Sequence, residues 1–283
     1  MGMGLAGMRV AVTGGARGIG RATAAALAAS GARVVIGDID ADTLAATAAE
    51  LTAATGADVI ALPLDVRDHE SFENFLDRAE AELGGLDGLV NNAGIMPTGS
   101  FLEEPMDLAD RQLDINLRGV IIGSKLAGRR FADRRRGHIV NVASVLGLVG
   151  TPDVATYSAT KFGVVGLGSA LHQELAAFDV HVSTLCPAFV NTELIAGLSP
   201  NRITRVIGFV EPEDVARAVV DVLARRRGGL RVVPRIGGIA IALLTAMPEG
   251  LRNRFGRLLG SHDTVSGADM SQRARYLERA GRS

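Results

Sequence analysis

Apolar and polar positions alternate in blocks along the first 233 residues, and the blocks predict alternating strands and helices. Short runs rich in Val, Ile and Leu are typical of buried strands. They cover Met8–Thr13, Arg33–Gly37, Val59–Leu62, Leu86–Asn91, His138–Ala143, Val180–Cys186 and Leu230–Val233. Helix-length segments cover Ile19–Ser30, Ala41–Thr55, His69–Leu83, Met106–Arg130, Pro152–Phe178 and Glu213–Arg227. This repeat predicts a parallel sheet with helices on both faces, the doubly wound α/β architecture.

The alternation ends at residue 233, so we divide the chain into an α/β domain, 1–233, and a helical C-terminal extension, 234–283, packed on the same domain. The extension begins with the apolar run Ile236–Met247. A basic stretch, Pro248–Gly260, follows, in which arginines alternate with apolar residues. We interpret the extension as a helical cap near the substrate cleft or a subunit interface. Contact with a membrane surface is the alternative. Asp269–Arg279 predicts another short helix.

Composition excludes several classes of protein. The net charge of -1 provides no general attraction for nucleic acid or an anionic membrane. No run reaches the roughly 20 apolar residues that span a bilayer, and Met1–Met8 lacks the features of a signal peptide. We therefore expect a cytoplasmic protein. The single cysteine, Cys186, predicts a buried core thiol and no internal disulfide. The histidines have no acid or cysteine at ligand spacing, so we expect no metal site.

A glycine-rich turn, Thr13–Gly20, follows the first strand directly and carries Gly14, Gly18 and Gly20 at the spacing Gly-x3-Gly-x-Gly. Glycine is needed where φ is positive or where the backbone must touch a ligand. The helix that follows offers free N–H groups and a partial positive charge to a pyrophosphate. Such a turn can be purely structural, but its place at the first β-α junction favours dinucleotide binding.

Two charged residues bear on which dinucleotide is bound. The second strand ends at Asp38, 24 residues after Gly14, where a carboxylate can bind the adenosine ribose and repel a 2′-phosphate. Arg17 has the opposite effect, because a guanidinium can pair with that phosphate. We give Asp38 more weight, since a carboxylate facing a dianion costs more than a flexible arginine gains. The prediction is NAD rather than NADP.

Further motifs follow in order: Asn91-Asn92-Ala93-Gly94, Asn116, Ser144 and Tyr157-x3-Lys161. Together with the glycine-rich turn they resemble the short-chain dehydrogenase/reductase family, across residues 8 to about 233. The resemblance implies a Rossmann-type seven-stranded sheet in the order 3-2-1-4-5-6-7. It also implies a homodimer or homotetramer, paired through the Met106–Arg130 and Pro152–Phe178 helices. The catalytic residues that it implies are Asn116, Ser144, Tyr157 and Lys161.

The chemistry of hydride transfer independently calls for these residue types. A hydride leaves carbon only if the hydroxyl proton also leaves, and tyrosine, with an ordinary pKa of about 10, is a poor base at pH 7. An ammonium nearby favours the phenolate, and Tyr157 and Lys161 are four residues apart on one predicted helix. Ser144 follows the fifth strand, where it could hold the substrate oxygen. By resemblance, Asn116 holds a water in a proton relay and Lys161 also binds the nicotinamide ribose.

The resemblance also implies the remaining cofactor contacts. Asp65 and Val66 match an adenine-contacting pair, and the Asn91–Gly94 segment lies beneath the adenosine. Pro187–Thr192 matches the segment that holds the carboxamide, although Ala188 replaces a glycine that is usual there. The predicted cofactor-binding residues are Gly14, Arg17, Gly18, Ile19, Gly20, Asp38, Asp65, Val66, Asn92, Ala93, Gly94, Tyr157, Lys161, Pro187, Val190 and Thr192.

The segments expected to line the substrate pocket, Met96–Phe101, Val145–Val149 and Phe189–Leu198, are almost uncharged. They favour a hydrophobic secondary alcohol or its ketone, or an alcohol and its aldehyde, as the substrate. Three alternatives stay open: an NADP-dependent carbonyl reductase, a dinucleotide-binding protein without turnover, and a membrane-associated protein that acts through its extension.

Overall fold

The computed structural model describes residues 5–195 and 209–234, together with single positions between 238 and 254. Seven strands form one sheet in the order β3-β2-β1-β4-β5-β6-β9, and every neighbouring pair is parallel. The predicted order 3-2-1-4-5-6-7 is confirmed, with β9 as the seventh strand. The strands are β1 (Arg9–Thr13), β2 (Arg33–Asp38), β3 (Val59–Pro63), β4 (Gly88–Asn91), β5 (Gly137–Val142), β6 (Val180–Pro187) and β9 (Gly229–Val233).

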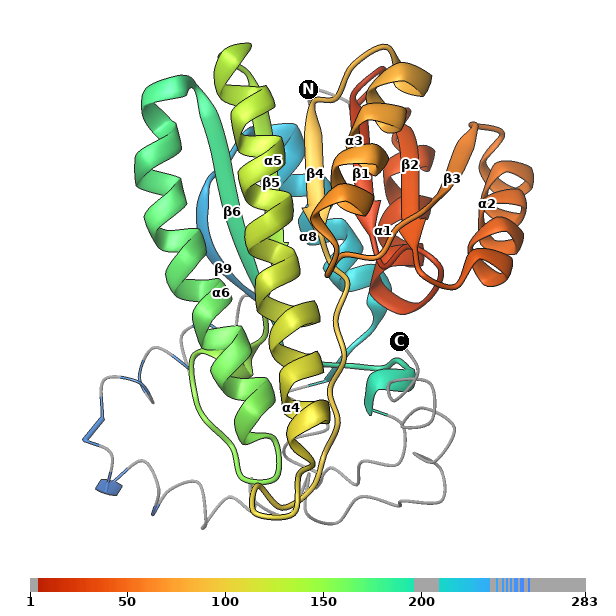
Figure 1. Ribbon diagram of the computed structural model, residues 1–283. Helices are drawn as coiled ribbons and strands as arrows, with labels where there is room; N and C mark the ends of the chain where they lie inside the picture. Colours follow the sequence, from red (N-terminus) through yellow and green to blue (C-terminus); the bar gives the residue numbers. More distant parts are fainter. Residues whose placement is uncertain are drawn as a thin grey trace.

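Helices cover both faces of this sheet (Figure 1). One face carries α1 (Gly18–Ala29), α2 (Ala41–Thr55) and α8 (Pro212–Arg225), whose apolar residues share a core with β1 and β2. The other face carries α3 (His69–Leu83), α5 (Gly119–Asp133) and α6 (Ala155–Glu174). Phe72, Phe75 and Phe131 fill the core beneath α3 and α5 and are almost completely buried. The predicted Rossmann-type architecture is therefore the one observed.

The helix boundaries follow from local capping chemistry. Asp40 caps the start of α2 by accepting a hydrogen bond from Thr43 N (3.1 Å). Asp68 caps α3 in the same way, accepting from Ser71 N (2.6 Å). Helix α2 ends at Gly56, which adopts φ 70°, a left-handed conformation that favours glycine. Because these signals are local, the sequence predicts both helices with the observed bounds.

Two predicted helices differ from the structure. The Met106–Arg130 segment consists of α4 (Met106–Leu113), a π-helical turn (Asp114–Arg118) and α5, which continues to Asp133. A π turn inserts an extra residue into the helical repeat, and hydrophobic periodicity does not reveal it. The segment predicted to begin at Pro152 becomes helical only at Ala155, because Asp153 has φ 62°. After α6 the chain forms a 3₁₀ turn, Leu175–Phe178.

A short parallel ribbon, which periodicity did not predict, lies beyond β6. It pairs β7 (Phe189–Val190) with β8 (Phe209–Val210). Most of the predicted extension, 234–283, lies outside the described residues, so its role as a cap or membrane contact stays a prediction. Within the described part of the chain, no helix combines the length and the hydrophobicity that crossing a lipid bilayer requires.

Candidate active site

The glycine-rich turn is fastened to the end of β4 by side-chain hydrogen bonds. Asn92 Nδ2 donates to the carbonyl oxygens of Thr13 (3.0 Å) and Gly14 (3.1 Å). In return, Thr13 Oγ1 accepts from the backbone N–H groups of Asn92 (3.0 Å) and Ala93 (3.1 Å). A Cβ atom on Gly14 would lie 2.8 Å from Ala93 Cα, and one on Gly20 would lie 2.0 Å from Gly14 O. The turn therefore requires glycine at both positions.

A cavity of about 490 Å³ opens beside this turn, at the carboxyl ends of the central strands. Most of the predicted cofactor-binding residues border it, although they come from distant parts of the sequence. Those on its wall are Gly14, Arg17, Gly18, Ile19, Asp38, Asp65, Val66, Asn92, Ala93, Gly94, Tyr157, Lys161 and Thr192. Gly20, Pro187 and Val190 do not line it. Gly20 lies against Gly14 O, Pro187 ends β6, and Val190 is buried in the short ribbon.

Acidic groups gather where β2 meets this cavity. Asp38 accepts hydrogen bonds from the backbone N–H groups of Ala16 (3.1 Å) and Asp40 (3.2 Å). Arg17 Nη2 donates to Asp40 Oδ2 (2.7 Å) and to Thr43 Oγ1 (2.6 Å). The hydrogen bond from Arg17 holds the pKa of Asp40 below its usual value. The guanidinium that was expected to counter Asp38 is thus engaged by a second acid that also lines the cavity.

Sequence reasoning missed Asp40 in this role, although it stands two residues after Asp38. Its place at the start of a helix explains the omission, because capping alone accounts for an aspartate there. Arg67 was missed as well. It lines the cavity and donates to Asp65 through Nε (2.9 Å) and Nη2 (2.7 Å). The hydrogen bonds from Arg67 lower the pKa of Asp65, so this predicted adenine contact is an ion-paired carboxylate.

Tyr157 and Lys161 lie one helical turn apart on α6, and both border the cavity. Lys161 is only 4% exposed, and its Nζ donates to the carbonyl oxygen of Val142 (3.0 Å) at the end of β5. The same Nζ lies 5.6 Å from the centre of the Tyr157 ring. Burial lowers the pKa of Lys161 to about 8. A titratable amine and a phenol are thus held together inside the protein at the wall of the cavity.

Asn116 occupies the π turn and is fully buried. Its Oδ1 accepts from Ile95 N (2.8 Å), and its Nδ2 donates to Ile95 O (2.8 Å) and Thr160 Oγ1 (3.3 Å). A Cβ atom on Gly94 would lie 3.1 Å from Asn116 Oδ1 and 3.6 Å from Lys161 Nζ. The amide of Asn116 and the amine of Lys161 therefore border the same small space beside Gly94.

Ser144 follows β5 and caps the 3₁₀ turn Val145–Gly147, where its Oγ accepts from Leu146 N (3.1 Å). This bond uses a lone pair of the hydroxyl and leaves its proton uncommitted. Cys186 lies on β6 and is completely buried. Burial raises the pKa of Cys186 to about 12, so the thiol stays neutral, as expected of a core cysteine.

Only some residues of the predicted substrate-binding segments lie together beside Tyr157. Met96 and Leu146 pack in one cluster with Tyr157, and Phe189 and Leu194 lie against it. Two other residues of these segments lie elsewhere. Leu148 belongs to the cluster beneath α5 and α6, and Phe101 is 65% exposed. Leu148 follows the 3₁₀ turn that holds Leu146, and the two residues pack in different clusters.

Comparisons with known proteins agree with this geometry. The model of the short chain dehydrogenase family matches residues 8–202. The chain belongs to the short-chain dehydrogenase/reductase family. Cis-4-hydroxycyclohexanecarboxylate dehydrogenase of Sinomonas cyclohexanicum is 41% identical over 222 residues, with 75% of this chain and 87% of the relative covered. The crystal structure of 3-ketoacyl-(acyl-carrier-protein) reductase from Brucella melitensis complexed with NADH superposes with TM-score 0.75 at 29% identity, covering 82% of this chain and 99% of that one.

A longer relative extends the match. "Probable oxidoreductase EphD" of Mycobacterium tuberculosis is 36% identical over 263 residues, which cover 86% of this chain but only 44% of EphD. This chain therefore spans less than half the length of EphD. The 86% of this chain that is covered is more than the share that residues 1–233 make up. The similarity to EphD therefore continues into the extension.

Proposed function

We propose that this protein is an NAD-dependent oxidoreductase that interconverts a hydrophobic secondary alcohol and its ketone, or an alcohol and its aldehyde. The observation that carries the proposal is the buried amine of Lys161, 5.6 Å from the ring centre of Tyr157, on the wall of the cavity that the glycine-rich turn borders. A charged group buried beside a second titratable group in a cavity is characteristic of active sites. The nicotinamide ring, when bound, supplies the hydride acceptor or donor.

The dinucleotide fits the residues at hand. Gly14 and Gly18 border the cavity and carry no side chain, so the backbone can approach a pyrophosphate closely there. The start of α1 favours its negative charge. Asp38 would bind the adenosine ribose, Asp65 and Val66 would flank the adenine, and Asn92, Ala93 and Gly94 would lie beneath the dinucleotide. Among the later positions, Thr192 would hold the carboxamide. The three predicted residues that do not line the cavity would support neighbouring backbone. Gly20 would support the glycine-rich turn, and Pro187 and Val190 would support the segment that leads to Thr192.

Proton transfer is assigned to Tyr157, with Lys161 and Ser144 acting on it and on the substrate oxygen. With a pKa of about 8, Lys161 is mostly an ammonium at pH 7, and its charge favours the phenolate of Tyr157. In the oxidation direction the phenolate takes the hydroxyl proton, and in the reduction direction the phenol returns it. The Ser144 hydroxyl orients the substrate oxygen. Asn116 borders the small space beside Lys161, through which the proton can exchange with solvent.

The decisive test is turnover by Tyr157→Phe in a screen of hydrophobic secondary alcohols with NAD. The change removes only the phenolic oxygen, so we expect turnover to fall by about 10²–10⁴-fold while NADH binding is unchanged. Tyr276→Phe is a chemically matched control, because Tyr276 is the second of the chain's two tyrosines. Undiminished turnover by Tyr157→Phe would refute this mechanism. A protein that binds NADH but converts none of the alcohols would instead support the dinucleotide-binding alternative.

The choice of NAD over NADP rests on Asp38 and Asp40, two carboxylates at the ribose end of the cavity. The ion pair of Arg17 with Asp40 removes the cation that could hold a 2′-phosphate. In Asp38→Asn, the side-chain oxygen can still accept from Ala16 N while the charge is gone, so we expect NADPH to bind more tightly relative to NADH. Asp42→Asn, on exposed α2 surface away from the cavity, is the control. Tighter binding of NADPH by the unmodified protein would establish the alternative, an NADP-dependent carbonyl reductase.

The apolar surroundings of Tyr157 support a hydrophobic substrate. Met96, Leu146, Phe189 and Leu194 supply this environment by packing in one cluster with Tyr157. The name of the Sinomonas relative denotes a secondary alcohol on a six-membered ring. We therefore place cyclic secondary alcohols first in the substrate screen.

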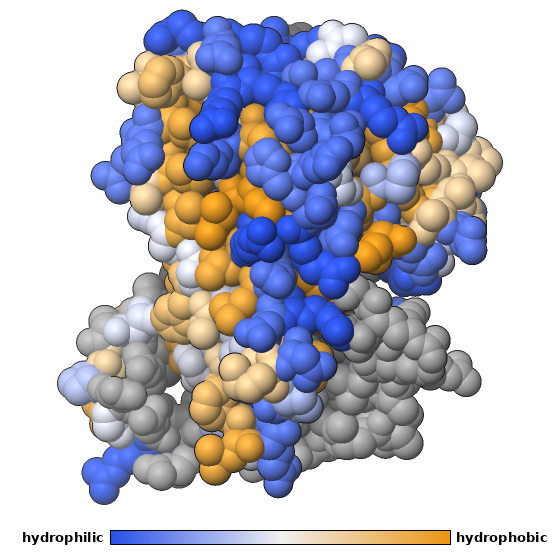
Figure 2. Space-filling view, in the orientation of Figure 1, coloured by the Kyte–Doolittle hydropathy of each residue, from blue (hydrophilic) through white to orange (hydrophobic). Residues whose placement is uncertain are grey.

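The surface of α5 and α6 supports the proposal of a homodimer or homotetramer. Figure 2 shows hydrophobic residues in the band between these two helices. Ile121 and Phe162 are exposed there, and a shallow groove lies between Ile121 and Leu171. We expect Ile121→Glu to yield monomers in analytical ultracentrifugation. Leu102→Glu, at a 92% exposed position in the loop before α4, should leave the assembly unchanged.

A further inference from the structure

A second cavity, of about 630 Å³, lies at the amino ends of the strands, opposite to the dinucleotide cavity. The amino ends of β4 and β6 are uppermost in Figure 1. It is enclosed by residues 5–8, the first residues of β5 and β6, and the C-terminal ends of α6 and α8. None of its lining residues borders the dinucleotide cavity. Whatever it binds therefore lies outside the site proposed for hydride transfer.

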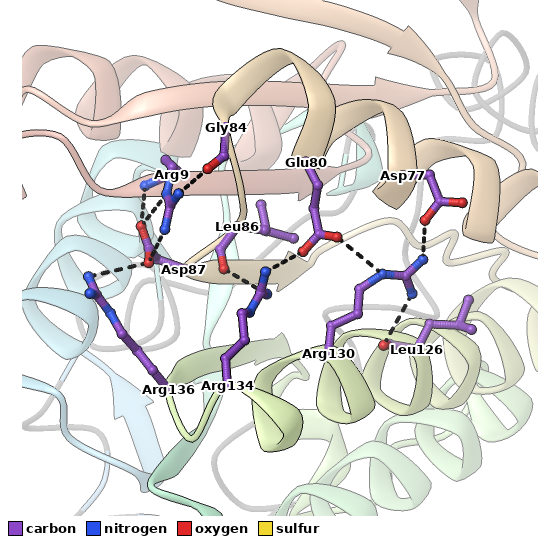
Figure 3. Close-up of polar contacts among 10 residues, drawn as sticks. All are labelled: Arg9, Asp77, Glu80, Gly84, Leu86, Asp87, Leu126, Arg130, Arg134 and Arg136. Atoms are coloured by element: carbon purple, nitrogen blue, oxygen red, sulfur yellow. Dashed lines mark hydrogen bonds and ion pairs between the residues drawn. The ribbon is translucent and has the colours of Figure 1, made fainter.

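The wall of this cavity carries more arginines than carboxylates. Asp87 lines it, but Arg9 donates to that carboxylate through Nε (2.8 Å) and Nη2 (2.9 Å), and Arg136 lies 3.3 Å from it (Figure 3). Asp179 is likewise paired with Arg135 at 3.0 Å. Each carboxylate on the wall thus has its own arginine, and Asp87 has two. The wall keeps an excess of positive charge, which favours an anion.

Arg226 adds to this excess. It caps α8, lines the cavity and makes no ion pair within the described part of the chain. The imidazoles of His138 and His181 line the same cavity as Arg226. An anion in the cavity would supply Arg226 with the partner that the fold does not.

The state of His138 can be deduced from its neighbours. Ser183 Oγ donates its proton to the carbonyl oxygen of Arg227 (2.5 Å). The contact between His138 Nε2 and Ser183 Oγ (2.8 Å) must therefore have Nε2–H as its donor. This fixes the tautomer and leaves a lone pair on Nδ1. Burial lowers the pKa of His138 to about 3, with His181, Arg226 and His172 adding to the effect, so the ring stays neutral near pH 7.

His138 Nδ1 has no hydrogen-bond partner among the described residues, although the residue is only 2% exposed and lines the cavity. A buried acceptor of this kind costs about 1–3 kcal/mol unless a donor reaches it. His172 Nδ1, on the same wall, is also unpartnered in this part of the chain. The wall thus offers a cation for an anion and an acceptor for a hydroxyl hydrogen.

We infer that this cavity binds a small oxyanion that retains a proton, namely a hydrogen phosphate ion. Its charged oxygens face Arg226, and its P–O–H donates to His138 Nδ1. An anion without a proton would direct a lone pair at Nδ1, which is unfavourable. A metal cation would face the excess of arginines, and the described residues contain no cluster of three or more side chains that could ligate one.

Histidine NMR of the full-length chain, with nitrogen-15 in the imidazoles, tests this inference. Inorganic phosphate is titrated at pH 7 and constant ionic strength, and sulfate, which has the same shape but no proton at this pH, is the comparison. We expect phosphate to shift Nδ1 of His138 and the signals of His181, and sulfate to bind at least about tenfold more weakly. His69, at the start of α3 and outside this cavity, is the internal reference.

Two neighbouring arginines give a matched pair of variants. Arg226→Gln removes the proposed ligand, and we expect it to weaken phosphate binding by about tenfold or more. Arg225→Gln removes the same charge one residue away, where the guanidinium pairs with Asp221 and does not line the cavity. We expect it to bind phosphate like the unmodified protein, and circular dichroism confirms that both variants fold.

Three results would overturn the inference: histidine signals that do not respond to phosphate, sulfate binding as tight as phosphate binding, or equal weakening by the two arginine variants. The histidine signals report on this cavity directly. Their response is therefore independent of whether the protein oxidises alcohols.

Discussion

The amine of Lys161 is buried, and replacing the residue by methionine reveals the energetic consequence. Burial lowers the pKa of Lys161 from its ordinary 10.5 to about 8, so the folded protein resists protonation of the amine more than the unfolded chain does. Because the folded-state value is the lower one, the stability linked to this group is complete above pH 10.5 and is lost as the pH falls through 8. In Lys161→Met, the side chain at position 161 no longer titrates in this window.

The magnitude follows from the two pKa values. At pH 7 the difference between 10.5 and about 8 corresponds to about 3 kcal/mol of unfolding free energy, and at pH 10 to about 1 kcal/mol. Lys161→Met also removes the donor to Val142 O, at a cost of about 1–3 kcal/mol that does not vary with pH. Between pH 7 and pH 10, the stability of the unmodified protein relative to Lys161→Met should therefore rise by about 2 kcal/mol.

Urea denaturation of both proteins at a series of pH values measures this change. Lys125→Met is the matched control, because Lys125 is an exposed lysine on α5 and its removal should leave the pH dependence of stability unaltered. A difference between the unmodified protein and Lys161→Met that stays constant from pH 7 to pH 10 would contradict the burial of a titrating amine. A change of the opposite sign would do so as well.

Three further substitutions test the packing around the site. Gly20→Ala places a Cβ 2.0 Å from a loop carbonyl oxygen, so fluorescence titration should detect no NADH binding, whereas Gly166→Ala, in open space on α6, should bind NADH normally. Phe131→Ala empties a fully buried site and should cost about 3–5 kcal/mol in urea denaturation; a cost below about 1 kcal/mol would contradict this packing. Glu104→Ala frees Thr156, the neighbour of Tyr157, and should lower kcat about tenfold with NADH affinity unchanged; an equal loss of NADH affinity would argue for general disruption instead.

Much of the fold could be predicted because its signals are local. The apolar runs identify the strands of the main sheet, and the aspartate caps and terminal glycines bound α2 and α3. The π turn at Asp114–Arg118 and the ribbon at Phe189–Val190 could not be predicted, because they depend on contacts made across the fold. A single π turn shifts the helical repeat by only one residue, and the apolar spacing of one segment does not locate so small a shift.

In the candidate site, too, features with local signals could be predicted and features that depend on distant contacts could not. Order and spacing were enough to nominate Tyr157 and Lys161, since two residues one helical turn apart must share a helix face. The partner of Arg17 could not be read from the sequence, because Asp40 serves as a helix cap and as a counter-ion at once. The burial that lowers the pKa of Lys161 arises from strands far away in the chain and is likewise invisible in one segment.

The last strand of the sheet has a consequence for how this fold could diversify. Val233, at the end of β9, accepts a hydrogen bond from Ala188 N (2.8 Å), so the polypeptide departs from the sheet close to the ribbon that precedes Thr192. The segment that carries Thr192, which borders the first cavity, thus lies next to the point where the chain leaves the sheet. Sequence variation at this point leaves the seven strands, the glycine-rich turn and the helix that carries Tyr157 as they are.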